Sequence, residues 1–141
     1  MRSRLALLAA LLLCGAAVRA EVDDPAAARL DYMLNCQGCH LPDGAGYPGK
    51  VPDVRRSLGA LLAVPGGREF VQRVPGAATA ALDDARLARV LNWMLAEFSQ
   101  APPGFAGFDA AEAGRLRRRP WTNVQAERAR LAAKAGIPAA Y

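Results

Sequence analysis

The sequence predicts an all-α fold, because helical patterns recur along the chain and no segment alternates apolar and polar residues as a strand would. The clearest predicted helix covers residues 82–98, where apolar side chains recur every three or four positions. Asp83 and Asp84 at its start suit the N-cap and the positive end of the helix dipole. The chain has 141 residues, a length typical of one domain.

The other predicted helices are shorter. A first helix is expected over residues 25–35 from its apolar spacing. Residues 37–65 are rich in Gly and Pro and are interpreted as a loop with one short helix near 57–63. A helical turn is expected over 67–73, closed by Pro75-Gly76. After a break at 101–104, residues 109–112 and 122–125 each have the pattern of a capping box; the second helix runs toward Lys134 and stops at Gly136 and Pro138.

Residues 1–20 are interpreted as a cleavable export signal. Arg2 and Arg4 precede an apolar run over 5–18, and small residues near position 20 predict cleavage between Ala20 and Glu21. The run is shorter than the roughly 18 residues that a membrane-spanning helix needs. We therefore expect a periplasmic protein with no transmembrane segment in its mature chain.

Processing changes the charge balance. The whole chain carries 18 basic and 13 acidic residues, a formal charge of +5, whereas the chain from residue 21 carries 15 basic and 13 acidic residues. The mature charge is uneven, since residues 21–98 have a net charge of −2 and residues 99–141 a net charge of +4. The overall charge thus gives no support for a nucleic-acid partner.

Cleavage also leaves two cysteines, both in the sequence Cys36-Gln37-Gly38-Cys39-His40. This spacing is typical of c-type haem attachment, in which two thiols tether the porphyrin and the adjacent His binds the iron. A thioredoxin-like dithiol would need a βαβ pattern, which is absent. A zinc site would need further Cys or His ligands, and the chain has one His.

With this motif, the chain resembles the class I (mitochondrial-type) monohaem cytochromes c over about residues 27–98. Tyr32 lies four residues before the first cysteine, and a Gly-rich stretch at 41–46 follows the motif. Pro52 comes twelve residues after the His, and residues 82–84 open a final helix that carries Trp93. The resemblance implies a cytochrome c domain over 21–98, followed by a basic helical extension over 99–141.

The resemblance also implies the roles of individual residues. Cys36 and Cys39 would attach one haem c covalently, and His40 would be an axial iron ligand. The carbonyl of Pro52 would accept a hydrogen bond from the other imidazole nitrogen. The implied function is electron transfer rather than enzymatic catalysis, with a dehydrogenase and a terminal acceptor as redox partners.

The sequence departs from this family at the sixth iron ligand. The family normally supplies a Met in the loop before the last helix, but residues 73–80 contain none. Met94, on the last predicted helix, is a possible sixth ligand or a core residue, and Met33 is badly placed for the distal face. Other formally possible ligands are Lys50, Asn92 and Lys134. The alternative is an iron with an open site that binds a small ligand, in a gas-sensing or peroxidase-like protein.

The basic extension has two interpretations. It can wrap the acidic domain through apolar contacts at Phe105, Phe108, Trp121 and Leu131, or it can dock an acidic redox partner. Wrapping is favoured, because isolated helices this short are marginal unless they pack.

Overall fold

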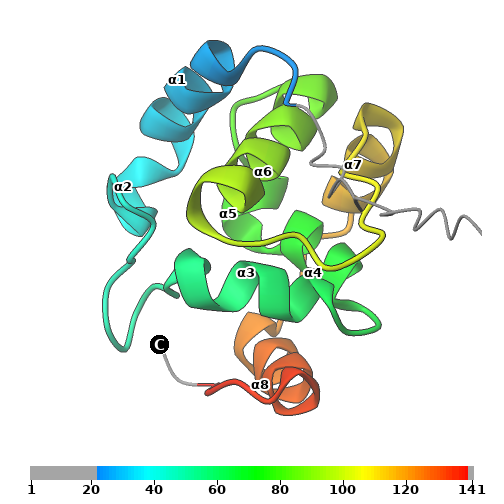
Figure 1. The fold of residues 1–141 in the computed structure, drawn as a ribbon. Coiled ribbons are helices and arrows are strands. Elements are labelled where there is room, and N and C mark those ends of the chain that lie inside the picture. The colour runs from blue at the N-terminus through cyan, green and yellow to red at the C-terminus, as the bar shows by residue number, and fades with distance from the viewer. Residues whose placement is uncertain (1–21, 140–141) are drawn as a thin grey trace, which may run out of the picture.

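The computed structural model describes residues 22–139, whose regular structure consists of α-helices (Figure 1). The predicted all-α fold class is confirmed. No helix in this part of the chain is long and apolar enough to cross a membrane. The segment interpreted as an export signal, residues 1–20, lies outside the described residues.

The first and last helices of the predicted cytochrome domain cross each other. α1 (Pro25–Asn35) lies against α6 (Asp84–Phe98), and their aromatic side chains form the contact. The ring of Tyr32 lies 5.2 Å from that of Trp93 and 5.1 Å from that of Phe98, centroid to centroid. Such tilted pairs add to the free energy gained from burying the rings.

A buried carboxylate joins the same two helices. Asp31 on α1 is 2% exposed, and its two oxygens accept hydrogen bonds from Arg86 and Arg89 of α6. The Arg86 guanidinium in particular holds the pKa of Asp31 below its ordinary value. Asp31 therefore stays ionised in the interior, where an unpaired carboxylate would be costly.

Two helices form the layer beneath this crossing. α3 (Val54–Leu62) is followed closely by α4 (Gly67–Arg73) (Figure 1). Their contact requires a glycine, because a Cβ on Gly67 would lie 1.7 Å from the carbonyl oxygen of Leu61. Phe70 of α4 is 1% exposed and points into the core.

The basic extension packs against the rest of the protein, as the wrapping interpretation predicts. α7 (Ala110–Arg117) lies beside α6, and α8 (Val124–Ala135) lies beneath α3 and α4 (Figure 1). Phe108 and Leu131 are buried in the hydrophobic core, and Phe105 and Trp121 pack against it. The extension and the preceding segment thus share one core.

Side-chain caps explain where the longer helices begin. In each case a carboxylate or amide oxygen accepts a hydrogen bond from a backbone N–H in the first turn, which would otherwise lack a partner. The caps of α1, α3, α6, α7 and α8 are Asp24, Asp53, Asp83, Asp109 and Asn123. The capping box expected at residues 122–125 is therefore shifted by one residue, because Asn123 and not Thr122 is the N-cap. α3 begins three residues earlier than expected because Asp53 caps it.

Two short helices were not predicted. α2 (Gln37–His40) lies in the segment interpreted as a loop, and α5 (Pro75–Ala78) lies where Pro75-Gly76 was expected to close a turn. Four residues are too few for helical periodicity to be detected. Pro75 also occupies the first turn of α5, where its missing N–H costs nothing, so it starts a helix here rather than ending one.

Candidate functional site

The unpredicted helix α2 presents the Cys-x-x-Cys-His motif on one turn. Cys36 ends α1, where its N–H donates to Tyr32 O at 2.8 Å, and its own carbonyl accepts from His40 N at 2.9 Å. Residues three and four apart share a helix face. Cys36, Cys39 and His40 therefore lie together on one face of a single turn.

A strap of backbone then passes back over the histidine. Tyr47 and Val51 pair as an isolated bridge, with N–H to O distances of 3.0 and 2.8 Å. The strap approaches Gly46 so closely that a Cβ there would lie 2.5 Å from Val51 O and 2.6 Å from Pro52 O. Gly46 also has a φ of +68°, so both the backbone conformation and the close contact require glycine.

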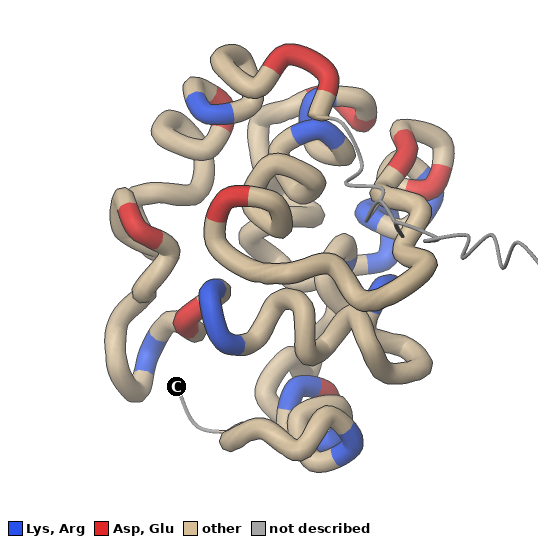
Figure 2. Tube along the Cα trace, in the orientation of Figure 1, with Lys and Arg blue, Asp and Glu red and all other residues tan. Residues whose placement is uncertain are grey.

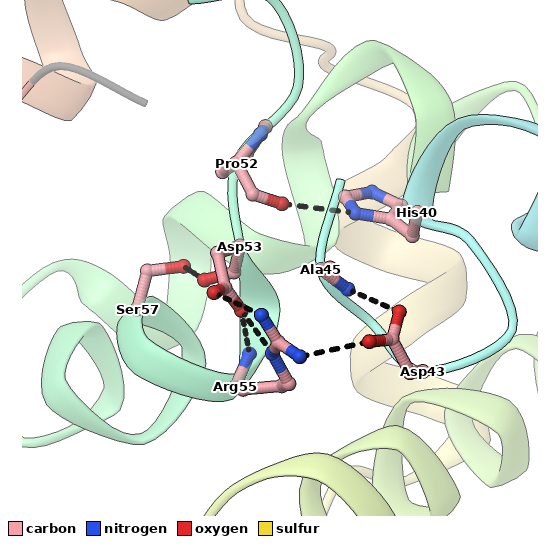
Figure 3. Close-up of polar contacts among 7 residues, drawn as sticks. All are labelled: His40, Asp43, Ala45, Pro52, Asp53, Arg55 and Ser57. Atoms are coloured by element: carbon pink, nitrogen blue, oxygen red, sulfur yellow. Dashed lines mark hydrogen bonds and ion pairs between the residues drawn. The ribbon is translucent and has the colours of Figure 1, made fainter. Parts of the chain in front are cut away.

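This strap brings Pro52 to the histidine ring, as Figure 3 shows. The carbonyl oxygen of Pro52 lies 3.3 Å from Nδ1 of His40. A carbonyl can only accept, so Nδ1 carries the proton and Nε2 keeps its lone pair. Burial lowers the pKa of His40, against the opposing effect of the Pro52 hydrogen bond. The ring is therefore held neutral and in the tautomer that ligates a metal through Nε2.

A polar network on the surface secures the strap (Figure 3). Arg55 donates to Asp53 and, at 2.8 Å, to Asp43, which also accepts from the N–H of Ala45. The hydroxyl of Ser57 donates to the carbonyl of Asp53. The guanidinium of Arg55 lowers the pKa of Asp53. These contacts connect the Gly-rich segment after His40 with the start of α3, on either side of Pro52.

The two cysteines are free thiols, with Cys36 half-buried and Cys39 exposed. Burial raises the pKa of Cys36 to about 11, with a smaller contribution from the negative charge of Asp31. A redox-active dithiol needs a lowered thiol pKa, because the thiolate is the reactive form. The environment of Cys36 therefore disfavours a thioredoxin-like role.

The motif opens onto an apolar cavity of about 290 Å³. Cys36, Cys39, His40 and Pro52 form part of its wall, and most of the remainder is aliphatic or aromatic. Because the cavity is partly open to solvent, its apolar wall would gain free energy from covering by a large apolar group, at about 25 cal/mol for each Å² of apolar surface removed from water. Haem is such a group, and it fits the chemistry of the lining.

The candidate sixth ligands differ in whether they line this cavity. Met94 is 5% exposed and lines it, whereas Met33 is 48% exposed and does not. Lys50, Asn92 and Lys134 do not line it either, and the amide of Asn92 is engaged with the backbone of Phe108. Segment 74–80, where the family places its Met, forms part of the wall with small and apolar residues.

Sequence reasoning missed two cavity residues in the extension. Val124 and Arg128 of α8 line the cavity, and the Arg128 guanidinium lies 5.7 Å from the ring centre of Phe70. Val124, Arg128 and the buried Leu131 are spaced four and three residues apart, which places them on one helix face. That spacing was the available signal, although it does not reveal which surface the face meets.

No family model matches the chain. The chain is 32% identical to cytochrome c-552 of Thermus thermophilus, in an alignment covering 90% of this chain and 97% of that protein. A second cytochrome c-552 of Thermus thermophilus is also 32% identical, with 70% of this chain and 92% of that protein aligned.

Proposed function

The chain belongs to the c-type cytochromes, and on this premise we propose that it is an exported carrier of single electrons with one haem c, held by Cys36, Cys39 and His40. The observation that carries the proposal is the arrangement of these three side chains on one turn at the wall of the apolar cavity. When bound, haem supplies an iron that accepts and releases one electron.

The residues of the motif have distinct roles in this proposal. Each thiol would add its S–H across a vinyl C=C of the porphyrin, which forms a thioether without a leaving group. His40 would ligate the iron through Nε2, while the Pro52 carbonyl 3.3 Å from Nδ1 fixes the ring. The aliphatic wall excludes water, which limits the rearrangement that accompanies a change of charge at the site.

Met94 is the proposed sixth ligand. Met94 belongs to the cavity wall, and a His/Met pair is the ligand set that raises the potential of cytochromes c. A saturated iron suits outer-sphere electron transfer. An iron without a sixth protein ligand would instead bind small molecules, so the ligand state decides between carrier and ligand-binding protein.

The test uses protein matured in a host with a c-type attachment system. We expect haem to remain bound after denaturation and acid–acetone extraction, and to be released in the Cys36→Ala/Cys39→Ala double variant. The reduced wild-type protein should not bind carbon monoxide rapidly, and the oxidised protein should show the thioether–iron charge-transfer band. Rapid, stoichiometric binding of carbon monoxide would overturn the six-coordinate carrier.

Export has a separate test. Fractionation of the same cells should recover the holoprotein in the periplasm, and N-terminal sequencing should begin at Glu21. Recovery of the intact chain in the cytoplasm would contradict the export signal without bearing on haem attachment.

A further inference from the structure

Four arginines surround a hollow on the side of α7 and α4. The hollow has a volume of about 400 Å³, and its wall contains Arg73, Arg115, Arg118 and Arg119 together with Glu69. Arg73 is paired with Glu69, whereas the other three arginines are exposed and enter no ion pair with any residue in 22–139. The hollow therefore carries a surplus of positive charge on a surface open to solvent.

The neighbouring Arg117 shows that the helix divides its arginines between two surfaces. Its side chain is 13% exposed and turns inward, where it donates to the backbone carbonyls of Ala78, Ala80 and Leu82. Packing of the extension thus accounts for the position of the Arg117 side chain. It does not account for the side chains of Arg115, Arg118 and Arg119, which form no ion pair with residues 22–139. Like charges gathered in one hollow repel each other unless an anion enters.

The surroundings of the hollow indicate what kind of anion this is. Acidic positions at the start of α7 lie next to the basic ones that follow them (Figure 2), and Glu69 belongs to the hollow itself. Glu69 is paired with Arg73 and Glu112 with Arg68, so the surface alternates acidic and basic groups and is not uniformly positive. An extended polyanion or an anionic lipid surface would place phosphates against these carboxylates as well as against the arginines. Discrete carboxylates on a protein face can avoid them and engage guanidinium groups in paired hydrogen bonds.

This surface is also connected with the apolar cavity. The guanidinium of Arg73 lies 4.0 Å from the ring centre of Trp121, and the backbone N–H of Trp121 donates to Arg73 O at 2.9 Å. The ring of Trp121 lies 6.5 Å from that of Phe70, and Phe70 lines the cavity. Two aromatic side chains therefore separate the hollow from the space assigned to the haem.

We propose that the arginine hollow of α7 and α4 docks an acidic, one-electron redox protein, whose surface carboxylates pair with Arg115, Arg118 and Arg119. This inference rests on the proposed electron-transfer function. With haem bound as proposed, the exchange would move one electron from the partner's redox centre to the haem of this chain, with no bond made or broken. Charge pairing of this kind acts mainly on the rate of encounter.

The experiment measures electron exchange of the holoprotein with an acidic blue-copper protein by stopped flow. The hollow variant replaces Arg115, Arg118 and Arg119 with Gln. The control variant makes the same change of net charge at exposed positions outside the hollow, with Gln at Arg29 of α1, Lys50 and Arg56 of α3.

At low ionic strength we expect the second-order rate constant to fall by about 10-fold in the hollow variant and by less than about 2-fold in the control. The difference should vanish at high salt, where charges are screened. Equal losses in both variants, or a larger loss in the control, would overturn the inference. The inference would also be overturned if the hollow variant lost binding to anionic vesicles while its rate constant with the copper protein stayed unchanged. The hollow would then bind a membrane surface.

Failure of the proposed function gives a different result. Each variant is first titrated with dithionite and ferricyanide, small reagents that need no docking surface. The carrier function would be contradicted if the wild-type protein bound no haem, or if it exchanged no electron with these reagents. Normal titration with equal rate constants for the copper protein in all variants would contradict the docking surface alone.

Discussion

Arg117 provides the sharpest test of how the extension supports the candidate site. Its three nitrogens donate to three different carbonyls: Nε to Ala78 O at 3.1 Å, Nη2 to Ala80 O at 2.6 Å and Nη1 to Leu82 O at 2.6 Å. Ala80 and Leu82 line the cavity. One side chain of the extension thus holds the segment between α5 and α6 that forms part of the cavity wall.

The Arg117→Gln variant removes these hydrogen bonds and leaves carbonyls of the buried Ala78 and Leu82 and the half-buried Ala80 without this partner. At about 1 kcal/mol for each bond, we expect the free energy of unfolding to fall by about 3 kcal/mol, or about 10 °C in Tm for a domain of this size. Arg117→Lys should lose nearly as much, because one ammonium group cannot reach three separate carbonyls. Carbon monoxide should also bind the reduced variant faster, since the loosened segment belongs to the wall.

Thermal and denaturant unfolding of the holoprotein measure the first effect, and stopped-flow mixing of the reduced holoprotein with carbon monoxide measures the second. Arg115→Gln, an exposed change on the same helix, is the control and should stay within about 0.5 kcal/mol of wild type. If Arg117→Gln matched this control in stability and in carbon monoxide binding, the reasoning from the three hydrogen bonds would be refuted.

Three further predictions concern other parts of the molecule. Asp31→Asn should lower the free energy of unfolding by about 2–3 kcal/mol at pH 7. Because Arg86 lowers the folded-state pKa of the Asp31 carboxyl from its ordinary 3.8, the wild type should lose this stabilisation as the pH falls below about 4. The free energy of unfolding of the variant should lack this pH dependence. Met94→Leu should abolish the thioether charge-transfer band while changing stability by less than about 1.5 kcal/mol; a band that persisted would exclude Met94 as ligand. Gly67→Ala should cost about 3 kcal/mol in urea denaturation, because its Cβ would meet Leu61 O at 1.7 Å; an unchanged midpoint would mean that α3 and α4 can separate freely.

The longer helices could be predicted from the sequence because local signals specify them. Residues 25–35 and 82–98 have apolar spacing over several turns, and the structure places α1 at the first range and α6 at Asp84–Phe98. The four-residue helices α2 and α5 lack such spacing. Their backbone is determined by the segments packed around them, which a local pattern does not contain.

The candidate site could be predicted only in part, for a related physical reason. Cys36, Cys39 and His40 are adjacent in sequence, so their spacing indicates their chemistry before any fold is known. Arg117 and Arg128 contact segments that are distant in the sequence. The residues next to them in the sequence do not show that Arg117 binds backbone carbonyls or that Arg128 lines the cavity, since a solvated arginine can have the same neighbours. The structure separates these roles by burial and by the carbonyls within reach.

The place of α8 in the cavity wall has a consequence for the order of assembly. The Cys-x-x-Cys-His motif lies toward the N-terminus at residues 36–40, whereas Val124 and Arg128 come from the opposite end of the chain. A chain that emerges from its N-terminus exposes the motif while this part of the wall is still missing. If haem is attached as proposed, the motif is available to receive it before α8 completes the cavity wall.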